Sequence, residues 1–204
     1  MRLAAVLLGL GLGLGLRLGF MGQDSRADAG VPPAWVATRG RVEPGVALGS
    51  YVLTSDAAPG RYSEGALVTA APIALPFRFA ITWRRLGPEA GRSMHVIVAG
   101  GVVLIKSGAI TLYAYDDAAF SASGWTPLPG FLTTAEHSLV VTQDSHAVNV
   151  AIDGTAVATF ALAVPQFSSV VGVGMKSAPG LRSAIYLRSL AIGAIGATGA
   201  TSAQ

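Results

Sequence analysis

The sequence contains no cysteine. This absence excludes disulfide bonds, thiolate catalysis, cysteine-ligated zinc and the lipid anchor of a bacterial lipoprotein. Charged side chains are also scarce, at 12% of the 204 residues, and no run of basic residues is longer than the pair Arg84-Arg85. The formal net charge of +3 is therefore too thin and scattered to form the basic patch that binds nucleic acid. We predict no nucleic-acid partner.

Helical periodicity is missing as well. No window of helical length has apolar residues at a sustained 3.6-residue period without glycine or β-branched residues. Hydrophobic residues make up 51% of the chain, which excludes a disordered protein. A domain of about 175 residues buries roughly 70% of its unfolded surface, enough for a core without covalent cross-links. We therefore expect one all-β domain that folds without a metal or another cofactor.

The N-terminus has the pattern of an export signal. Met1-Arg2 is followed by the apolar run "LAAVLLGLGLGLGL", and an Ala-x-Ala pattern ends at Ala29. The apolar run is too short to span a bilayer comfortably. We predict cleavage of residues 1–29, a secreted or periplasmic cell-envelope location, and no stable membrane span afterwards. Because Arg17 interrupts the apolar run and Ala29 lies rather far beyond it, a retained anchor and a true start at Met21 are the alternatives.

Short β-type runs separated by turn residues fill the rest of the chain. The spacing of roughly 8–12 residues is typical of an antiparallel sandwich or barrel. The predicted organisation is a lead-in at 30–43, a domain at 44–192 and a flexible Gly/Ala tail at 193–204. The predicted strands are 46–53, 64–70, 76–86, 93–105 (broken at Gly100-Gly101), 109–115, 137–143, 146–152, 155–162, 168–176 and 183–192.

The clearest hairpin signal is "VNVAIDGTAVAT". Two alternating runs flank Asp153-Gly154, a pair that tolerates the positive φ angles of a type I′ turn. We expect Ile152 to oppose Thr155, Val150 to oppose Val157, and Val148 to oppose Thr159. Asp153 is therefore predicted to form a turn rather than to act as a catalytic carboxylate.

The order of these segments resembles a known family. A strand opened by His137 is followed by the Asp-Gly hairpin, the glycine-rich "VVGVGMK" and the apolar "AIYLRSLAI". This succession is similar to the C-terminal half of concanavalin-like lectin and glucanase jelly rolls. The similarity is specific over 137–192 and extends more loosely over 44–192. It implies an antiparallel two-sheet jelly-roll sandwich of about six strands a sheet, with one concave sheet that often carries the ligand site.

Motifs for catalysis or metal binding are absent. The glucanases of this family place carboxylates on one strand as E-x-D-x-x-E or E-x-D-x-E, and neither pattern occurs here. The adjacent "DSH" at 144–146 cannot align as a catalytic triad, and the three histidines are too far apart in sequence for a metal motif. We predict no catalytic residue and no metal ligand. A composite hydrolase or lyase site remains an alternative, in which Asp116 or Asp117 acts with Glu64 or Glu89.

A ligand-binding face is predicted from strand alternation. In "FRFAITWRR", the residues Phe77, Phe79, Ile81 and Trp83 share one face. If the strands at 76–86, 93–105 and 109–115 are neighbours in one sheet, its outer face carries four residues of a candidate glycan site: Arg84, His95, Tyr113 and Tyr115. Trp125, in the loop that follows, is expected to overhang them. Aromatic rings stack on the C–H face of a sugar, and fixed polar groups bind its hydroxyls.

These observations favour a non-catalytic binding module with a polysaccharide or glycan as ligand. A composite-site glycoside hydrolase or lyase is one alternative. The other is a structural domain that packs against a partner protein, in which the tyrosines only fit a half-exposed sheet. The sequence does not fix the oligomeric state.

Overall fold

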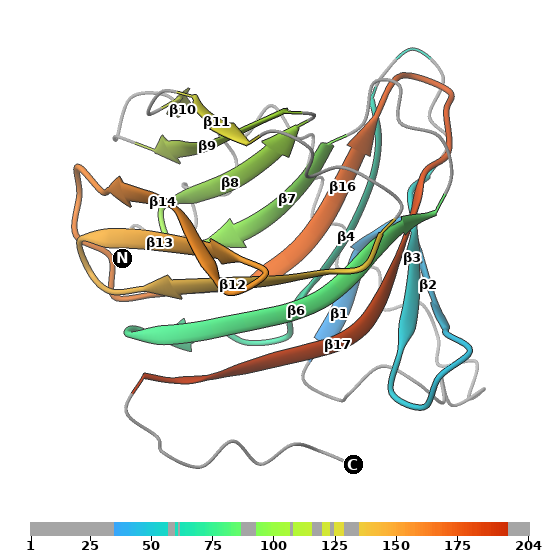
Figure 1. The fold of residues 1–204 in the computed structure, drawn as a ribbon, viewed down its shortest axis with the longest axis horizontal. Helices are drawn as coiled ribbons and strands as arrows, with labels where there is room; N and C mark the ends of the chain where they lie inside the picture. The colour runs from blue at the N-terminus through green and yellow to red at the C-terminus, as the bar shows by residue number, and fades with distance from the viewer. Residues whose placement is uncertain are drawn as a thin grey trace.

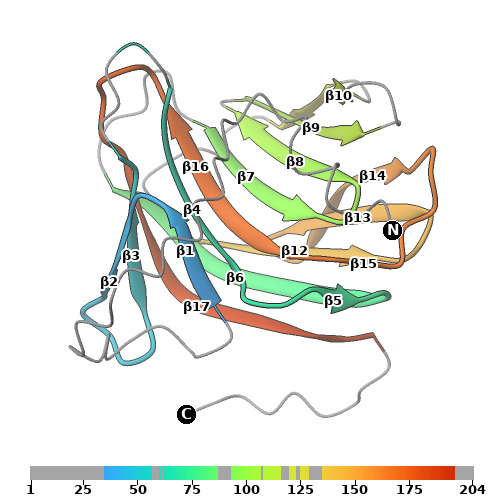
Figure 2. The ribbon, with the colours of Figure 1, turned by 180° about the vertical axis from the view of Figure 1, so that it is seen from behind.

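The computed structural model describes residues 35–56, 60, 62–86, 93–106, 108–115, 120–122, 125–128 and 135–195. These residues form two antiparallel sheets packed face to face (Figures 1 and 2). They contain no helix long and apolar enough to cross a membrane. The predicted signal at 1–29 and most of the predicted tail lie outside the described residues.

One sheet has eight strands in the order β1-β4-β16-β7-β8-β9-β10, with β11 paired to the other part of β9. Its strands are β1 (Trp35–Arg39), β4 (Ser63–Thr69), β7 (Ser93–Val98), β8 (Gly101–Lys106), β9 (Gly108–Tyr115), β10 (Phe120–Ala122), β11 (Thr126–Leu128) and β16 (Gly172–Ser177). The strands from β7 to β10 are consecutive in the chain and form a meander. The strands β1, β4 and β16, which come from the two ends of the described chain, extend the sheet on the other side of β7.

The other sheet has seven strands in the order β14-β13-β12-β6-β17-β3-β2. They are β2 (Arg41–Pro44), β3 (Tyr51–Thr54), β6 (Phe77–Leu86), β12 (His137–Gln143), β13 (Ala147–Ile152), β14 (Thr155–Ala161) and β17 (Ala184–Ala194). Two short strands, β5 (Ile73–Ala74) and β15 (Ser168–Ser169), form a separate pair. The antiparallel two-sheet sandwich predicted from the sequence is confirmed.

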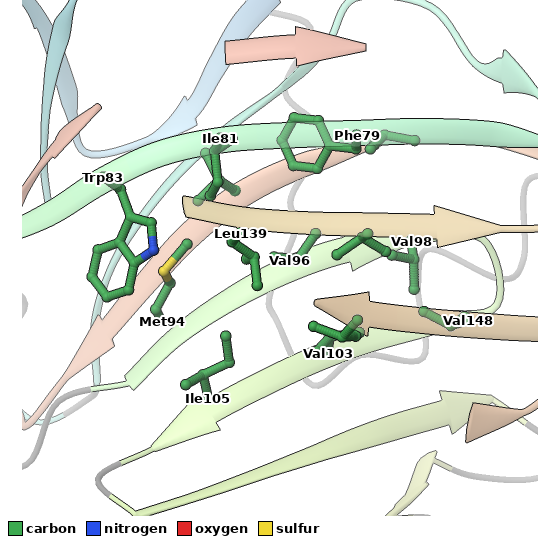
Figure 3. Close-up of a cluster of buried hydrophobic side chains, with 14 of the residues drawn as sticks. Phe79, Ile81, Trp83, Met94, Val96, Val98, Val103, Ile105, Leu139 and Val148 are labelled. Carbon is green, nitrogen blue, oxygen red and sulfur yellow. The ribbon is translucent and has the colours of Figure 1, made fainter. Parts of the chain in front are cut away.

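The core lies between the two sheets and follows the predicted alternation. Phe79, Ile81 and Trp83 of β6 are buried, and Arg78 and Arg84 of the same strand are exposed. Figure 3 shows β6 side chains facing Met94 and Val96 of β7 across the sandwich. The alternation also holds on β7 and β9, where the buried residues are Met94, Val96, Val98, Ile110 and Leu112. His95 and Tyr113 therefore lie on the other side of their strands, as predicted.

The strand break predicted at Gly100-Gly101 is also observed. Ala99 and Gly100 form a turn between β7 and β8, and Gly100 has a φ of 75°, in the left-handed region that favours glycine. Gln143 lies on the facing sheet, and its side-chain amide forms two hydrogen bonds with the backbone of Ala99. Its Nε2 donates to the carbonyl oxygen at 2.8 Å, and its Oε1 accepts from the backbone N–H at 2.9 Å. This turn is therefore fixed by a buried contact between the two sheets.

The Asp-Gly hairpin has the predicted turn, and part of its predicted register is wrong. Asp153 and Gly154 have φ angles of 50° and 78°, and Ile152 opposes Thr155. A bulge between Val150 and Ala151 then shifts the pairing, so that Val150 opposes Ala158, not Val157, and Val148 opposes Phe160, not Thr159. The extra residue turns Phe160 into the core, where its ring is buried.

Several strand boundaries differ from the sequence prediction. The predicted lead-in at 30–43 includes β1 and most of β2, and the run 46–53 begins as a strand only at Tyr51. The run 168–176 is divided between β15 and β16. At the other end, Gly193 and Ala194 continue β17 by pairing with β6, although the tail was predicted to begin at Gly193. The short strands β5, β10 and β11 were not predicted at all.

Candidate functional site

The outer face of the eight-stranded sheet holds most of the predicted site. Because the core takes alternate residues of each strand, the remaining side chains of β4, β16, β7, β8 and β9 point away from the core. The register places them in transverse rows. One row contains Ala66, Gly174, His95, Leu104 and Thr111, and the next contains Val68, Gly172, Ile97, Val102 and Tyr113.

His95 and Tyr113 therefore share this face, as predicted, with one strand between them. Tyr115 lies on the same strand as Tyr113, opposite Phe120 of β10, and its side chain is outside the described part. Thr111 points away from the core by its position but is fully buried, which the alternation did not predict.

Arg84 does not belong to this face, and its predicted place beside His95 is wrong. β6 pairs with β12 and β17, so it lies in the seven-stranded sheet rather than next to β7. The chain crosses from one sheet to the other between β6 and β7. The guanidinium of Arg84 lies 5.2 Å from the ring centre of Tyr186, beside a shallow hollow that Glu136 and Arg188 also line.

Trp125 lies over the outer face at the edge formed by β8, β9 and β11. Its ring meets that of Tyr113 edge to face, with centroids 6.4 Å apart, and the ammonium of Lys106 lies 5.0 Å from its centroid. The side chain is 43% exposed, whereas the two other tryptophans, Trp35 and Trp83, are buried. Large apolar rings on solvent-exposed sheet faces favour stacking with a ligand.

A second aromatic and charged group lies at the opposite side of this face, and the sequence prediction missed it. Glu64 of β4 accepts a hydrogen bond from Arg39 at 2.9 Å and lies 3.5 Å from the ammonium of Lys176. The same ammonium lies 4.5 Å from the ring centre of Tyr62, which is 55% exposed. The alternation in "VGVGMK" could have revealed Lys176, because Val173 and Met175 face the core.

The imidazole of His95 lies between these two groups and is half-buried. A side chain at Gly174 of the neighbouring strand would collide with the ring, so the glycine makes room for it. Burial, and then the positive charge of Lys176, lowers the pKa of His95 to about 4. His95 is therefore neutral at pH 7. Within the described part of the chain, neither ring nitrogen has a hydrogen-bond partner.

The low pKa of His95 predicts an acid-sensitive fold. Between about pH 6.5 and pH 4 the unfolded chain binds a proton at this histidine and the folded chain does not, so stability falls as the pH falls through that range. The loss should reach about 2–3 kcal/mol. Urea unfolding at about pH 7 and about pH 4.5 measures it. His95→Gln should remove most of this difference.

His146 is the matched control for this prediction. It is exposed, and its Nδ1 lies 2.7 Å from the hydroxyl of Ser145. His146→Gln should therefore keep the acid sensitivity of the natural chain. An unchanged pH dependence in the His95 variant would contradict the burial of its imidazole.

The other acidic and histidine residues form turns and pairs. Asp153 lies 2.7 Å from Nδ1 of His137 and accepts a hydrogen bond from the backbone of Ser138 at 2.8 Å. Partial burial would raise the pKa of Asp153, but these hydrogen bonds outweigh it and lower the pKa. Asp153 thus links the hairpin turn to the neighbouring strand β12. This role is structural, as predicted.

No three His, Asp or Glu side chains gather as metal ligands among the residues that the structure describes. Three carboxylates proposed for a composite catalytic site, Glu89, Asp116 and Asp117, lie outside those residues. The fourth, Glu64, is the only acidic residue on the described strands of this face.

Searches with protein-family models and among curated proteins find no match. Solved structures do match. The carbohydrate recognition domain of Emp47p aligns with a TM-score of 0.62 at 14% identity, covering 80% of this chain and 89% of that domain. The carbohydrate-binding module CBM66 from Bacillus subtilis aligns with a TM-score of 0.56 at 9% identity, covering 78% of this chain and 94% of the module.

The Crh5 transglycosylase in its apo form aligns with a TM-score of 0.58 at 15% identity, covering 81% of this chain and 80% of the enzyme. These similarities confirm the predicted concanavalin-like jelly-roll fold. At such low identity they extend to the fold alone, and they include both binding modules and an enzyme.

Proposed function

We propose that this chain is an exported, non-catalytic carbohydrate-binding module whose ligand lies on the outer face of the eight-stranded sheet. The observation that carries the proposal is the exposed ring of Trp125, held by Tyr113 and Lys106 on the same face as a neutral, unpartnered His95. A sugar stacks its C–H face on such a ring and uses its hydroxyls to bind fixed polar groups.

The solved neighbours support a glycan as the ligand class. Two of them are described as a carbohydrate recognition domain and a carbohydrate-binding module, and a third is a transglycosylase. A binding role is favoured over glycoside hydrolysis because hydrolysis needs two carboxylates roughly 5–10 Å apart. The described part of this face offers Glu64 alone, and that carboxylate is engaged by Arg39 and Lys176.

A panel of polysaccharides separates the candidate functions. A binding module should retain soluble glycans or give signal on a glycan array without releasing reducing ends or unsaturated sugars. Turnover of any glycan would support the hydrolase or lyase alternative instead. Neither binding nor turnover across the panel would favour the alternative of a domain that packs against another protein.

Export is part of the same proposal and has its own test. The apolar N-terminal run and the Ala-x-Ala pattern support removal of residues 1–29. The intact mass of the protein recovered outside the cytoplasm should correspond to a chain that begins within a few residues of Gly30. A full-length product in the cytosol would contradict export, and a full-length product in the membrane would support the retained anchor.

A further inference from the structure

The two lysines of this chain, Lys106 and Lys176, both lie on the candidate glycan face. Each ammonium lies over an exposed aromatic ring, that of Lys106 over Trp125 at 5.0 Å and that of Lys176 over Tyr62 at 4.5 Å. The face therefore has two separate lysine–aromatic pairs. Each pair combines a surface on which a sugar ring can stack with a positive charge beside it.

The two pairs lie along one transverse row of the sheet. Lys176 of β16 opposes Ser93 of β7. Since Met94 opposes Ile105, the position on β8 next to Ser93 is that of Lys106. Two strand spacings thus separate the lysines, which places their Cα atoms about 10 Å apart. His95 lies two residues from Ser93 on the same side of β7, between the pairs.

The charges on this face do not balance. Its described strands carry three cations, Arg39, Lys106 and Lys176, and one carboxylate, Glu64. Arg39 holds Glu64 at 2.9 Å, and the pair is largely buried. Lys106 has no carboxylate partner among the described residues. Glu64 is shared by Arg39 and Lys176, so one negative charge meets three positive ones and the described strands keep an excess of two positive charges. Such an excess is complementary to negative charge on a ligand.

We infer that the ligand is an acidic polysaccharide, which crosses the strands from the Tyr62–Lys176 pair to the Lys106–Trp125 pair and places an acidic group at each lysine. The inference rests on the proposed function and adds the ligand class. The acidic group is a carboxylate or a sulfate ester. Both are anions that an ammonium binds, and the test below distinguishes them.

Matched polymers test the charge requirement. Binding is measured by isothermal titration for polygalacturonate, alginate and dextran sulfate, beside the methyl-esterified forms of the first two and unmodified dextran. The acidic member of at least one pair should bind about tenfold more tightly or better, and added NaCl should weaken that binding. A preference within a polyuronate pair identifies carboxylate, and one confined to the dextran pair identifies sulfate. Equal affinities within all three pairs would overturn the inference.

Charge-removing variants place the effect at the two lysines. Lys106→Gln and Lys176→Gln should each weaken binding of the acidic polymer about fivefold, the effect of one exposed ion pair. Arg41→Gln is the matched control, because it removes the same charge from an exposed side chain of the other sheet. Equal losses of affinity in all three variants would show that the polymer is attracted by the net charge of the protein, and would contradict a binding site at the two lysines.

The absence of other lysines allows a second readout that needs no substitution. Acetylation by an amine reagent can modify only Lys106, Lys176 and the N-terminal amine. A saturating acidic polymer should slow acetylation of both lysines, measured by peptide mass spectrometry, relative to the N-terminal amine. Unchanged rates at both lysines would refute the proposed placement.

Failure of this inference is distinct from failure of the proposed function. If the chain binds neutral glycans and does not discriminate between charged and uncharged partners, the carbohydrate-binding function stands and the acidic ligand class is wrong. If neither the acidic nor the neutral polymers bind, both are wrong.

Discussion

Trp125→Ala should weaken glycan binding about ten- to a hundredfold. The ring is 43% exposed and contacts Tyr113 and Lys106 on the candidate face, so its loss removes a stacking surface without opening the core. The melting temperature should change little, because substitutions at exposed positions usually alter the free energy of unfolding by less than about 1 kcal/mol. Isothermal titration and a thermal melt of the same preparation measure both quantities.

Leu48→Ala is the control for this prediction. Leu48 is 98% exposed on the loop between β2 and β3 of the other sheet, so its truncation also removes exposed apolar surface. It should leave both glycan affinity and stability unchanged. Unaltered binding by the Trp125 variant would place the ligand elsewhere, and unfolding of that variant would show that the ring is part of the core.

Trp35→Ala should destabilise the fold by about 3–5 kcal/mol. Trp35 begins β1, is 8% exposed, and packs its ring 5.8 Å from that of Phe79 on the facing sheet. Its truncation leaves a cavity between the sheets, and the surrounding strands relax only partly around it. Chemical unfolding monitored by far-ultraviolet circular dichroism measures the loss.

Val36 provides an adjacent control. It follows Trp35 on the same strand, faces outward and is 47% exposed. Val36→Ala should therefore cost no more than about 0.5 kcal/mol. Similar small effects at both positions would show that β1 is not integral to the sandwich.

Sequence alternation predicted which side chains enter the core far better than it predicted which strands become neighbours. The inward set of β6, from Phe77 to Trp83, is confirmed because a two-residue period is a local property of a half-buried strand. Arg84 was misplaced because alternation defines the face of a strand and not its sheet. β6 pairs with β12 and β17, which lie more than fifty residues further along the chain.

Two further errors have equally specific causes. The bulge after Val150 adds one residue to the hairpin, and no local signal distinguished the core-facing Phe160 from Thr159. The lead-in was not recognised as strands because its glycines and prolines resemble a loop, yet β1 and β2 gain their stability by adding to sheet edges. The stability of these two strands depends on their pairing with β4 and β3, which a local reading of the lead-in does not reveal.

Only part of the candidate site was predictable, because alternation is a local property of the sequence and strand pairing is not. His95, Tyr113 and the overhanging Trp125 follow from alternation and from a loop aromatic, whereas Tyr62 and Lys176 become neighbours of the site only through the pairing of β4 with β16. The significance of the two lysines depends on the same distant pairing. Their aromatic partners come from other segments of the chain.

The most direct test of the central claim uses tryptophan fluorescence. Trp35 and Trp83 are buried in the core, so Trp125 should supply most of the emission that acrylamide quenches. A glycan bound on the outer face of the eight-stranded sheet should protect that emission from quenching at saturation. A glycan that binds while the quenchable fraction stays unchanged would contradict the placement of the site on this face.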